Sequence, residues 1–512
     1  MGIFEKLINK VERNPKSTRG FYFGASEAEG ENIDGQSLTD YFEDYLDILS
    51  ELKNGKFIFV GRKGVGKSAI AKFIKDSSQN TESSFAKLIR VNDFDLEKNI
   101  QIDFDPGSQK EKLIFEWLIL VNIVKLIISN KHSQYTKEYN KLQKFLDVNS
   151  GVVNIDEFEV IESSRNKGGE VSFGNLLHVF GGVFKNYFDV KTTRAEFYKL
   201  IPPLRDIVKI ILEYPVNKEI EFWILFDDLD VNFNIKSEQD NFKLMELIRI
   251  SKFYNNEIFN NNNARILIFL RDDIKNKLAP KYEDSAKIFN TYQIPLFWYD
   301  HRLYSGNSED LIPLKKLANK RIELNFKKNR ISYGSDPWQT LFEDENYNGI
   351  DFPKKTSFKY ILDFTFYRPR DLITFLNTMT SESCEFPLNK RDVKSLLPKY
   401  IELNINEIKS ELKLFFNDGE LRKIFDKLFP YIISSANCKS ENVLEFLDTL
   451  NLSMGHHTAF EILTNYSLLI YRDAFGTLYF NYREEMSFAN INKSELFITL
   501  PKCVYHHYKK IT

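Results

Sequence analysis

The chain has 512 residues, of which 43% are hydrophobic and 28% charged, a composition typical of a globular protein with more than one core. Lys+Arg number 70 and Asp+Glu 72, so the net charge of -2 excludes the strongly basic class that binds nucleic acid through bulk charge and leaves only a local patch for that purpose. The three cysteines, Cys384, Cys438 and Cys503, lack metal or disulfide spacing, which favours a reducing compartment. Because no apolar run resembles a signal peptide or a membrane span, we expect a cytoplasmic protein without a membrane partner.

The first expected elements follow a polar, glycine-rich lead-in. Hydrophobic residues at helical spacing predict a helix from Leu38 to Leu52. Lys56–Val60 then has the pattern of a short buried strand that leads into a glycine loop. We expect a helix over Ala69–Ile74 and the next strand over Leu88–Val91.

The middle of the chain is expected to be an insertion followed by two core strands. Residues 100–215 have a mostly helical pattern, with strong apolar segments at Leu113–Ile128 and Glu196–Leu212. Phe222–Phe226 and Arg265–Leu270 are apolar runs that each end in charge. Such runs predict parallel strands that are buried on both faces.

Beyond about residue 305 the strand signals stop, and helices dominate to about residue 415. Leu444–Leu450 and Ala459–Asn465 predict two short helices, and Leu468–Tyr482 predicts a β-hairpin around a turn at Asp473–Thr477. Helix, helix, hairpin is the order of a winged-helix domain. We expect a lead-in at 1–37, an α/β core at 38–300, a helical region at 301–415 and a C-terminal winged-helix-like domain at 416–512.

A phosphate-binding motif lies between the first strand and the next helix. Residues 61–68 match G-x-x-x-x-G-K-[ST], and strand before and helix after is the context that the motif requires. Glycines let backbone N–H groups turn inward around phosphates, and the helix adds its positive end. Lys67 is expected to contact the β- and γ-phosphates and Ser68 to contact Mg²⁺. We therefore predict ATP and Mg²⁺ as cofactors, with the nucleotide held by Gly61, Arg62, Lys63, Gly64, Val65, Gly66, Lys67, Ser68 and Ala69.

An acidic pair directly follows the apolar run Phe222–Phe226 and has the pattern of a Walker B strand. Asp227 is expected to hold Mg²⁺ through water, and Asp228 to orient or deprotonate the attacking water. Alone, this pattern often marks a strand end that meets solvent, but beside a P-loop the functional interpretation is the better one. Asp230 is interpreted as a solvated acid in the following turn.

Arg271 ends the next predicted core strand, where a cationic residue can sense the γ-phosphate. Asp272 or Asp273 would orient its guanidinium. An ion pair at a strand terminus explains the same residues equally well, and both interpretations stay open.

Asn389–Asp392 fits the guanine-reading pattern N-K-x-D, but no apolar strand precedes it. We interpret it as a helix start with Asn389 as N-cap, so guanine specificity is not expected. A basic cluster between Lys315 and Arg330 is interpreted as a solvated helix face rather than a phosphate-binding stripe.

Over about residues 20–400 the chain resembles a group of bacterial P-loop ATPases related to the AAA+ and STAND classes, which are mostly uncharacterised. The first two motifs of this resemblance occur in many ATPases, so the last two carry its specificity. The motifs are GRKGVGKS at 61–68, DDLD at 227–230, FLRDDI at 269–274 and RPRD at 368–371, preceded by Phe23-Gly24 and Glu27-Ala28-Glu29 in the lead-in.

The resemblance implies an α/β fold: a P-loop NTPase core with a parallel sheet of the additional-strand type, a helical lid and often a C-terminal winged helix. Arg368 or Arg370 would be the sensor arginine of the lid, although a helix started by Pro369 with solvent-facing arginines fits the same residues. Arg302 and Arg321 are weak candidates for an arginine finger. Members of the group often belong to antiviral or stress-response systems.

These observations favour a regulatory, Mg-dependent ATPase that couples its nucleotide state to conformational change or assembly. It is expected to form a homo-oligomer and to act on a protein partner or effector chain. Since Asp228 stands where many AAA+ enzymes have glutamate, slow or switch-like turnover is a further expectation. The alternative is a nucleotide-gated DNA-binding protein that uses the winged helix. Asn451–Asn465 contains no Lys or Arg, which favours the protein partner over DNA.

Overall fold

The structure of the protein is a computed structural model. It describes residues 17–25, 30, 38–90, 110–130, 137–150, 170–189, 192–230, 237–259, 263–306, 308–348, 354–435, 437–480 and 495–509. The lead-in residues Glu27-Ala28-Glu29 and the end of the predicted hairpin at Asn481 and Tyr482 lie outside these ranges.

The chain forms two compact units. Unit 1 consists of residues 1–45, 63–66 and 297–512, and unit 2 consists of residues 46–62 and 67–296. The middle of the glycine loop therefore groups with unit 1, while both of its flanks group with unit 2. The finer domain boundaries expected from the sequence stay predictions.

Unit 2 is built on a five-stranded sheet whose pairs are all parallel. Strand β6 lies between β1, which leads into the glycine loop, and β5, which carries the acidic pair. This arrangement confirms the expected α/β fold with an additional strand in the P-loop NTPase core. Across the sheet the order is β2 (Ser84–Arg90), β5 (Glu221–Asp227), β6 (Ala264–Arg271), β1 (Ile58–Gly61) and β7 (Gln293–Pro295).

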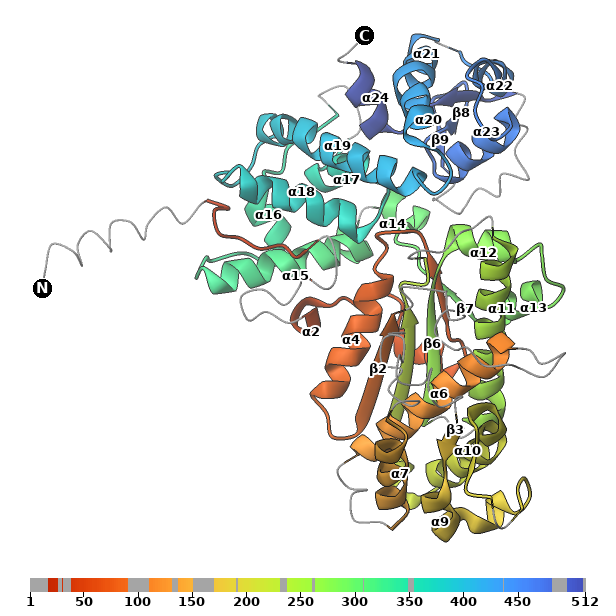
Figure 1. The fold of residues 1–512 in the computed structure, drawn as a ribbon. Helices are drawn as coiled ribbons and strands as arrows, with labels where there is room; N and C mark the ends of the chain where they lie inside the picture. Colours follow the sequence, from red (N-terminus) through yellow and green to blue (C-terminus); the bar gives the residue numbers. More distant parts are fainter. Residues whose placement is uncertain are drawn as a thin grey trace, which may run out of the picture. The chain divides into compact units, whose positions relative to one another are not determined.

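The burial of β5 and β6 explains why their sequences are apolar. In β5 every residue after Glu221 is buried, and in β6 only Arg265 is not. Since successive side chains point to opposite faces, both faces of these strands are covered. The helices α4 (Lys67–Gln79) and α6 (Lys110–Ser129) both pack against the sheet, α4 mainly against β2 and α6 against β5 and β2 (Figure 1). Both strand predictions are confirmed.

The rest of unit 2 is mainly helical, as expected, but it also holds a small antiparallel pair that the sequence reading missed. The pair consists of β3 (Glu170–Ser172) and β4 (Arg194–Glu196), each too short for a period-2 signal. The helices are α3 (Ile48–Lys53), α7 (Lys137–Val148), α9 (Gly174–Phe184), α10 (Phe197–Leu212), η3 (Pro215–Asn217), α11 (Glu238–Phe253), η4 (Tyr254–Ile258), α12 (Asp272–Leu278) and α13 (Ser285–Tyr292).

The continuous helix predicted from Leu38 to Leu52 is wrong. The structure has α2 (Leu38–Tyr41) and, after a break, α3. Asp47 has a φ of 50°, in the left-handed region, which ends any right-handed helix at that point. Tyr45, which fitted the helical spacing, instead packs against Trp298 with ring centroids 3.8 Å apart and the rings tilted by 32°. Tyr45 and Trp298 both belong to unit 1. Tertiary packing of Tyr45 therefore prevailed over the helical periodicity of its local sequence.

In unit 1, helices dominate after residue 300, as predicted. The Asn389 side chain accepts hydrogen bonds from the backbone N–H groups of Arg391 and Asp392, which confirms it as the N-cap of the longest helix. Pro369 stands at the start of its helix, as expected. The elements are α14 (His301–Ser305), η5 (Glu309–Leu311), α15 (Pro313–Lys328), α16 (Pro337–Leu341), α17 (Ser357–Leu362), α18 (Pro369–Ser381) and α19 (Lys390–Leu412).

The last hundred residues show the expected order of two helices and a hairpin, in which β8 pairs antiparallel with β9. A third strand, β10, pairs with β8 from the other side. The winged-helix interpretation of this region stays a prediction. The elements are α20 (Asp418–Lys423), η6 (Ile424–Leu428), α21 (Phe429–Ser434), α22 (Ser440–Thr449), α23 (His456–Asn465), β8 (Ile470–Arg472), β9 (Leu478–Tyr479), β10 (Phe497–Thr499) and α24 (Lys502–Lys509).

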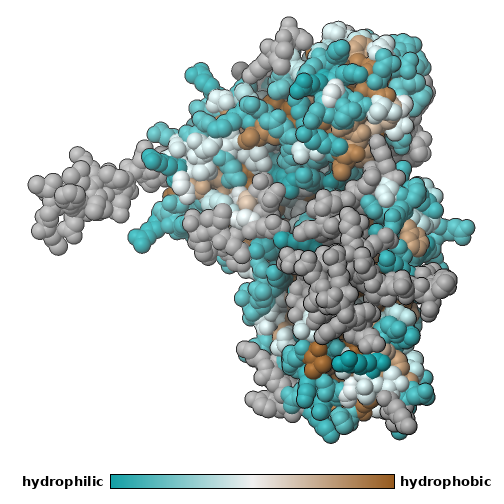
Figure 2. Space-filling view, viewed as in Figure 1, coloured by the Kyte–Doolittle hydropathy of each residue, from teal (hydrophilic) through white to brown (hydrophobic). Residues whose placement is uncertain are grey.

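The described surface in Figure 2 is mostly hydrophilic, and its hydrophobic residues occur in small groups. Phe475, in the turn between β8 and β9, is the most exposed large hydrophobic residue described, at 96%. Among the helices that the structure describes, none combines the length and hydrophobicity needed to cross a lipid bilayer.

Candidate functional site

The glycine loop joins the end of β1 to the start of α4. Gly64 and Gly66 have φ angles of 81° and 101°, a region that residues with a side chain rarely adopt. A Cβ on Gly64 would also lie 3.2 Å from Cβ of Arg370. Gly64 and Gly66 are therefore required by the backbone, and Gly64 also by a close neighbour.

Lys67 lies at the start of α4 and folds back over the loop. Its Nζ donates to the carbonyl oxygens of Gly61, at 2.9 Å, and Arg62, at 3.0 Å. Burial lowers the pKa of the Lys67 ammonium, and nearby Arg271 lowers it further, while Asp230, Asp272 and Asp227 oppose this. An ammonium has three donors, so one remains to serve a phosphate oxygen.

The sheet brings the carboxylate of Asp227 to the first turn of α4. The Ser68 side chain, in the first turn of α4, lies close enough to lower the pKa of the Asp227 carboxyl. Asp227 is 2% exposed, and its Oδ2 is buried without a hydrogen-bond partner among the described residues. Burial raises the Asp227 pKa, although Ser68 and Lys67 counteract the shift. A buried carboxylate oxygen without a donor is well suited to a cation.

The donor set at Ser68 and Asp227 fits Mg²⁺, which prefers oxygen ligands and usually keeps water and phosphate oxygens in its coordination shell. No cluster of three or more His, Cys, Asp or Glu residues that could hold a metal occurs in the described part of the chain. A cation at this point would therefore take one carboxylate and one hydroxyl from the protein and its other ligands from water and a nucleotide.

Asp228 follows β5 with a φ of 55°, in the left-handed region. Asp tolerates this conformation better than most residues, yet it carries strain that often accompanies functional positions. Its Oδ2 lies 3.4 Å from Nε of Arg90, the last residue of β2. The two acids therefore have different surroundings: Asp227 is buried, whereas Asp228 lies beside Arg90.

Arg271 is 7% exposed and is held by two acids. It donates from Nε and Nη2 to both carboxylate oxygens of Asp273, at 3.1 and 2.6 Å, and from Nη1 to Asp230, at 2.9 Å. Of the two orienting acids expected, Asp273 has that contact. The interpretation of Asp230 as a solvated turn acid is wrong, because it is an ion-pair partner in the candidate site.

Arg368, an expected sensor arginine, is 2% exposed, in unit 1. It contacts Asp371 from Nε and Nη2, and from Nη1 it donates to Glu411, at 2.8 Å, and to the carbonyl oxygen of Lys63, at 3.1 Å. Burial opposes the Arg368 charge, but Asp371 and Glu411 outweigh it and raise the pKa. The guanidinium is thus committed to protein partners. The alternative of a solvent-facing Arg368 is wrong, and its role as a sensor arginine stays a prediction.

Arg370 contacts Glu407 through Nη1, and its side chain covers Gly64. The two arginine-finger candidates differ in exposure. The Arg302 side chain is 88% exposed. Arg321 is 7% exposed, donates to the carbonyl oxygen of Phe23 at 2.6 Å, and so is wrongly placed for a finger that must reach another subunit.

The basic cluster around α15 is not a uniformly solvated face. Lys315 is 3% exposed and lies 2.8 Å from the carboxylate of Asp336. Arg321 is buried as described above, whereas Lys327 is exposed. The prediction of a solvated face is therefore wrong for Lys315 and Arg321. Because Lys315 and Arg321 are buried against protein partners, they do not suit a phosphate-binding stripe either.

Two contacts in the candidate site were missed at the sequence level. Arg90 approaches Asp228 because the sheet register pairs Arg90 with Asp227, and a charge at the end of the predicted second strand was the available signal. Trp298 donates from Nε1 to the carbonyl oxygen of Val65, at 2.8 Å. Nothing in the local sequence of Trp298 indicates a partner so distant along the chain.

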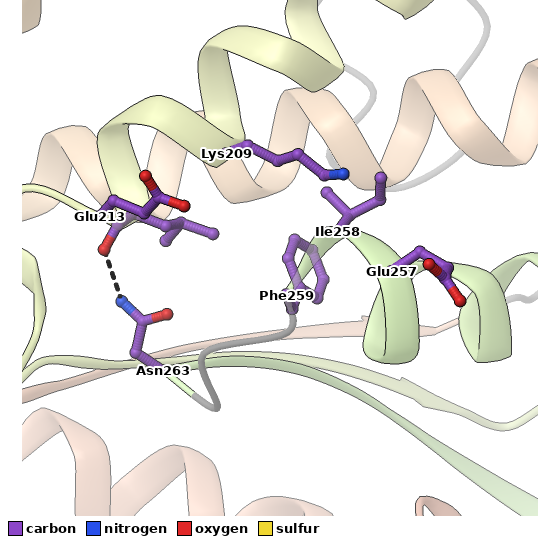
Figure 3. Close-up of a pocket in the computed structure, with 7 residues that line it drawn as sticks. Lys209, Glu213, Glu257, Ile258, Phe259 and Asn263 are labelled. Atoms are coloured by element: carbon purple, nitrogen blue, oxygen red, sulfur yellow. Dashed lines mark hydrogen bonds between the residues drawn. The ribbon is translucent and has the colours of Figure 1, made fainter.

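A separate cavity of about 130 Å³ lies in unit 2, at the amino end of β6 (Figure 3). Lys209, Glu213 and Glu257 border it, and Asn263 donates there to the carbonyl oxygen of Leu212 at 3.2 Å. The glycine loop follows β1 and Asp227 ends β5, so the candidate site belongs to the carboxyl ends of the strands. The cavity lies at the amino ends and is separate from that site.

A family described as the FunZ-associated C-terminal helical domain matches residues 313–409, which run from α15 into α19. Among curated proteins, the chain is 23% identical to a "Putative transposon gamma-delta 80.3 kDa protein" of Escherichia coli K12, over 80% of the chain and 52% of that protein. It is 26% identical to a "Putative ankyrin repeat protein" of Borreliella burgdorferi over 37% of the chain and 38% of that protein. The chain thus spans about half the length, or less, of these relatives.

Among solved structures, the chain is similar to a Walker-type ATPase of Pyrococcus abyssi, with 12% identity, over 92% of the chain and 99% of that structure. The TM-score is 0.37, too low for this likeness to support an argument about fold or function. The assignment of the site therefore depends on the loop, the sheet order and the side chains described above.

Proposed function

We propose that this chain binds ATP with Mg²⁺ at the glycine loop and hydrolyses it. The observation that carries the proposal is the Oδ2 of Asp227, which is buried without a hydrogen-bond donor and belongs to a carboxyl whose pKa burial raises and the neighbouring Ser68 lowers. Structural acids of this kind are usually fully hydrogen-bonded. An orphaned oxygen beside the hydroxyl of a complete P-loop motif is what a magnesium–nucleotide site requires.

Each group has a defined task in this proposal. Lys67 supplies positive charge to the phosphates, and the backbone N–H groups of the loop bind their oxygens. Asp228 accepts a proton from, or orients, the attacking water, and Arg90 holds its carboxylate in place. Arg271 stabilises charge on the transferred phosphoryl group, in an orientation fixed by Asp273. Ser68 and Asp227 would hold Mg²⁺, which would neutralise negative charge on the phosphates.

ATP is favoured over GTP, because the guanine-like motif is a helix cap. The Asn389 side chain is occupied by the N–H groups of Arg391, at 2.8 Å, and Asp392, at 3.1 Å. Regulation of a protein partner by nucleotide state is the expected output, with an antiviral setting as the further expectation from the resemblance. DNA binding has less support, since α23 contains no Lys or Arg.

The test is steady-state hydrolysis of ATP and GTP by wild type and Lys67→Ala, with and without duplex DNA. The proposal predicts Mg-dependent ATP turnover that falls by about 10²-fold or more in Lys67→Ala, and no stimulation by DNA. Turnover that survives in Lys67→Ala would place hydrolysis elsewhere. DNA stimulation would favour the nucleic-acid alternative.

A further inference from the structure

Three successive carbonyl oxygens in the glycine loop accept hydrogen bonds from residues that lie far away in the sequence. All of the donors and acceptors belong to unit 1. The pairs are Lys63 O with Arg368 Nη1 at 3.1 Å, Gly64 O with the Arg370 backbone N–H at 3.4 Å, and Val65 O with Trp298 Nε1 at 2.8 Å.

These contacts bear on phosphate binding because a peptide unit is planar and trans. The carbonyl of one residue and the N–H of the next point in opposite directions. A donor that holds the carbonyls of Lys63, Gly64 and Val65 outward therefore directs the N–H groups of the next residues, ending with Gly66, to the other side. In a P-loop that side is the phosphate side. The outer contacts thus fix the orientation of the groups that bind phosphate.

The side chains that donate are themselves held firmly. Arg368 is 2% exposed and is fixed by Asp371 and Glu411. Trp298 is 7% exposed, and its ring packs against Tyr45. A rigid donor loses little conformational entropy when it holds the loop, so its hydrogen bond is worth more to the ordered state.

We propose that Trp298, Arg368 and Arg370 are positioning residues that pre-organise the glycine loop for phosphate, and that they act on the backbone of the loop rather than on the nucleotide. The proposal rests on nucleotide binding at this loop. It assigns Arg368 a role different from that of a sensor arginine. Since Arg368 and Arg370 lie within the FunZ-associated helical match, rearrangement of those helices would change nucleotide affinity through the loop carbonyls.

Trp298→Phe tests this most cleanly, because it removes the Nε1 donor and keeps an aromatic ring against Tyr45. The matched control is Trp338→Phe. Trp338 is 2% exposed in the same unit, stacks on Phe342, and donates from Nε1 to the Ser357 hydroxyl at 3.0 Å. Each variant loses one buried indole hydrogen bond, but only one of the two bonds reaches the loop.

The measurements are the thermal midpoint without nucleotide, Kd for Mg·ADP by calorimetry, and KM and kcat for ATP. Trp298→Phe is expected to raise Kd and KM by about three- to tenfold, with kcat changed less than about twofold. Trp338→Phe should leave Kd within about twofold of wild type while both midpoints fall by similar amounts.

Equal Kd values in Trp298→Phe, Trp338→Phe and wild type would overturn the positioning role while leaving nucleotide binding intact. A drop in kcat at unchanged KM for Trp298→Phe would also contradict it, since it would place the effect in the chemical step. If wild type itself binds no Mg·ADP, the proposed function fails, and this inference fails with it.

Discussion

The Ser68 side chain, in the first turn of α4, lies beside Asp227 at the end of β5, where burial raises the pKa of the Asp227 carboxyl and Ser68 lowers it. One oxygen of that carboxylate, Oδ2, is buried without a hydrogen-bond partner among the described residues. This pairing follows from the sheet order, which sets β5 one strand away from β1 across β6.

Asp227→Asn should stabilise the nucleotide-free protein at neutral pH. Burial raises the Asp227 pKa above its ordinary value of 3.8, so the folded state holds the proton more tightly than the unfolded state. The resulting penalty on folding is absent below pH 3.8, grows as the pH rises through the raised pKa, and is complete above it.

Melting curves of wild type and Asp227→Asn, recorded from about pH 4 to about pH 8 without nucleotide or metal, check this pH dependence. The melting temperature of Asp227→Asn, relative to that of wild type, should increase as the pH rises. An advantage of wild type that increases with pH would mean that the charged carboxylate is stabilised in the fold, and the cation-site interpretation would lose its physical basis.

Asp228→Asn should separate nucleotide binding from hydrolysis. Asn tolerates the positive φ at this position, so backbone strain does not change, while the group loses its ability to accept a proton. We expect kcat to fall by about 10²- to 10⁴-fold, with the ATP Kd within about threefold of wild type. Single-turnover quenching and equilibrium binding measure the two quantities. Normal turnover would show that Asp228 is not the catalytic acid–base group.

Arg271→Gln should reduce stability by about 3 kcal/mol, because Asp273 and Asp230 lose their cation in a largely buried place. The double variant Arg271→Gln/Asp273→Asn should recover part of that stability. If Arg271 senses the γ-phosphate, ATP turnover stays about 10²-fold low in the double variant. Turnover that returns together with stability would make Arg271 only an ion-pair partner. Urea unfolding and ATPase assays on the same preparations decide between them.

Much of the core could be predicted from sequence because its signals are local. The glycine motif, the apolar strands at 222–226 and 265–270 and the Asn389 cap each have a pattern confined to a few residues. The small pair β3 and β4 and the strand β7 are three residues each, below the length at which alternation is recognisable.

The contacts around the site were less predictable because they depend on the register of the sheet or on tertiary packing. Arg90 approaches Asp228 only through the pairing of β2 with β5. Nothing in the local sequence of Arg368 or Arg321 indicates burial. In the structure both side chains are buried, and they donate to the carbonyl oxygens of Lys63 and Phe23, which are far away in the sequence. The positive φ of Asp47 and the contact between Tyr45 and Trp298 likewise have no local signal.

The most direct measurement of the central claim is the ATP affinity of wild type and Asp227→Asn, each with Mg²⁺ and with EDTA, by calorimetry. If Ser68 and Asp227 form one magnesium–nucleotide site, Mg²⁺ should tighten ATP binding to wild type by about tenfold or more and should have little effect on Asp227→Asn. An equal effect of Mg²⁺ on both proteins, or ATP binding to neither, would contradict the account.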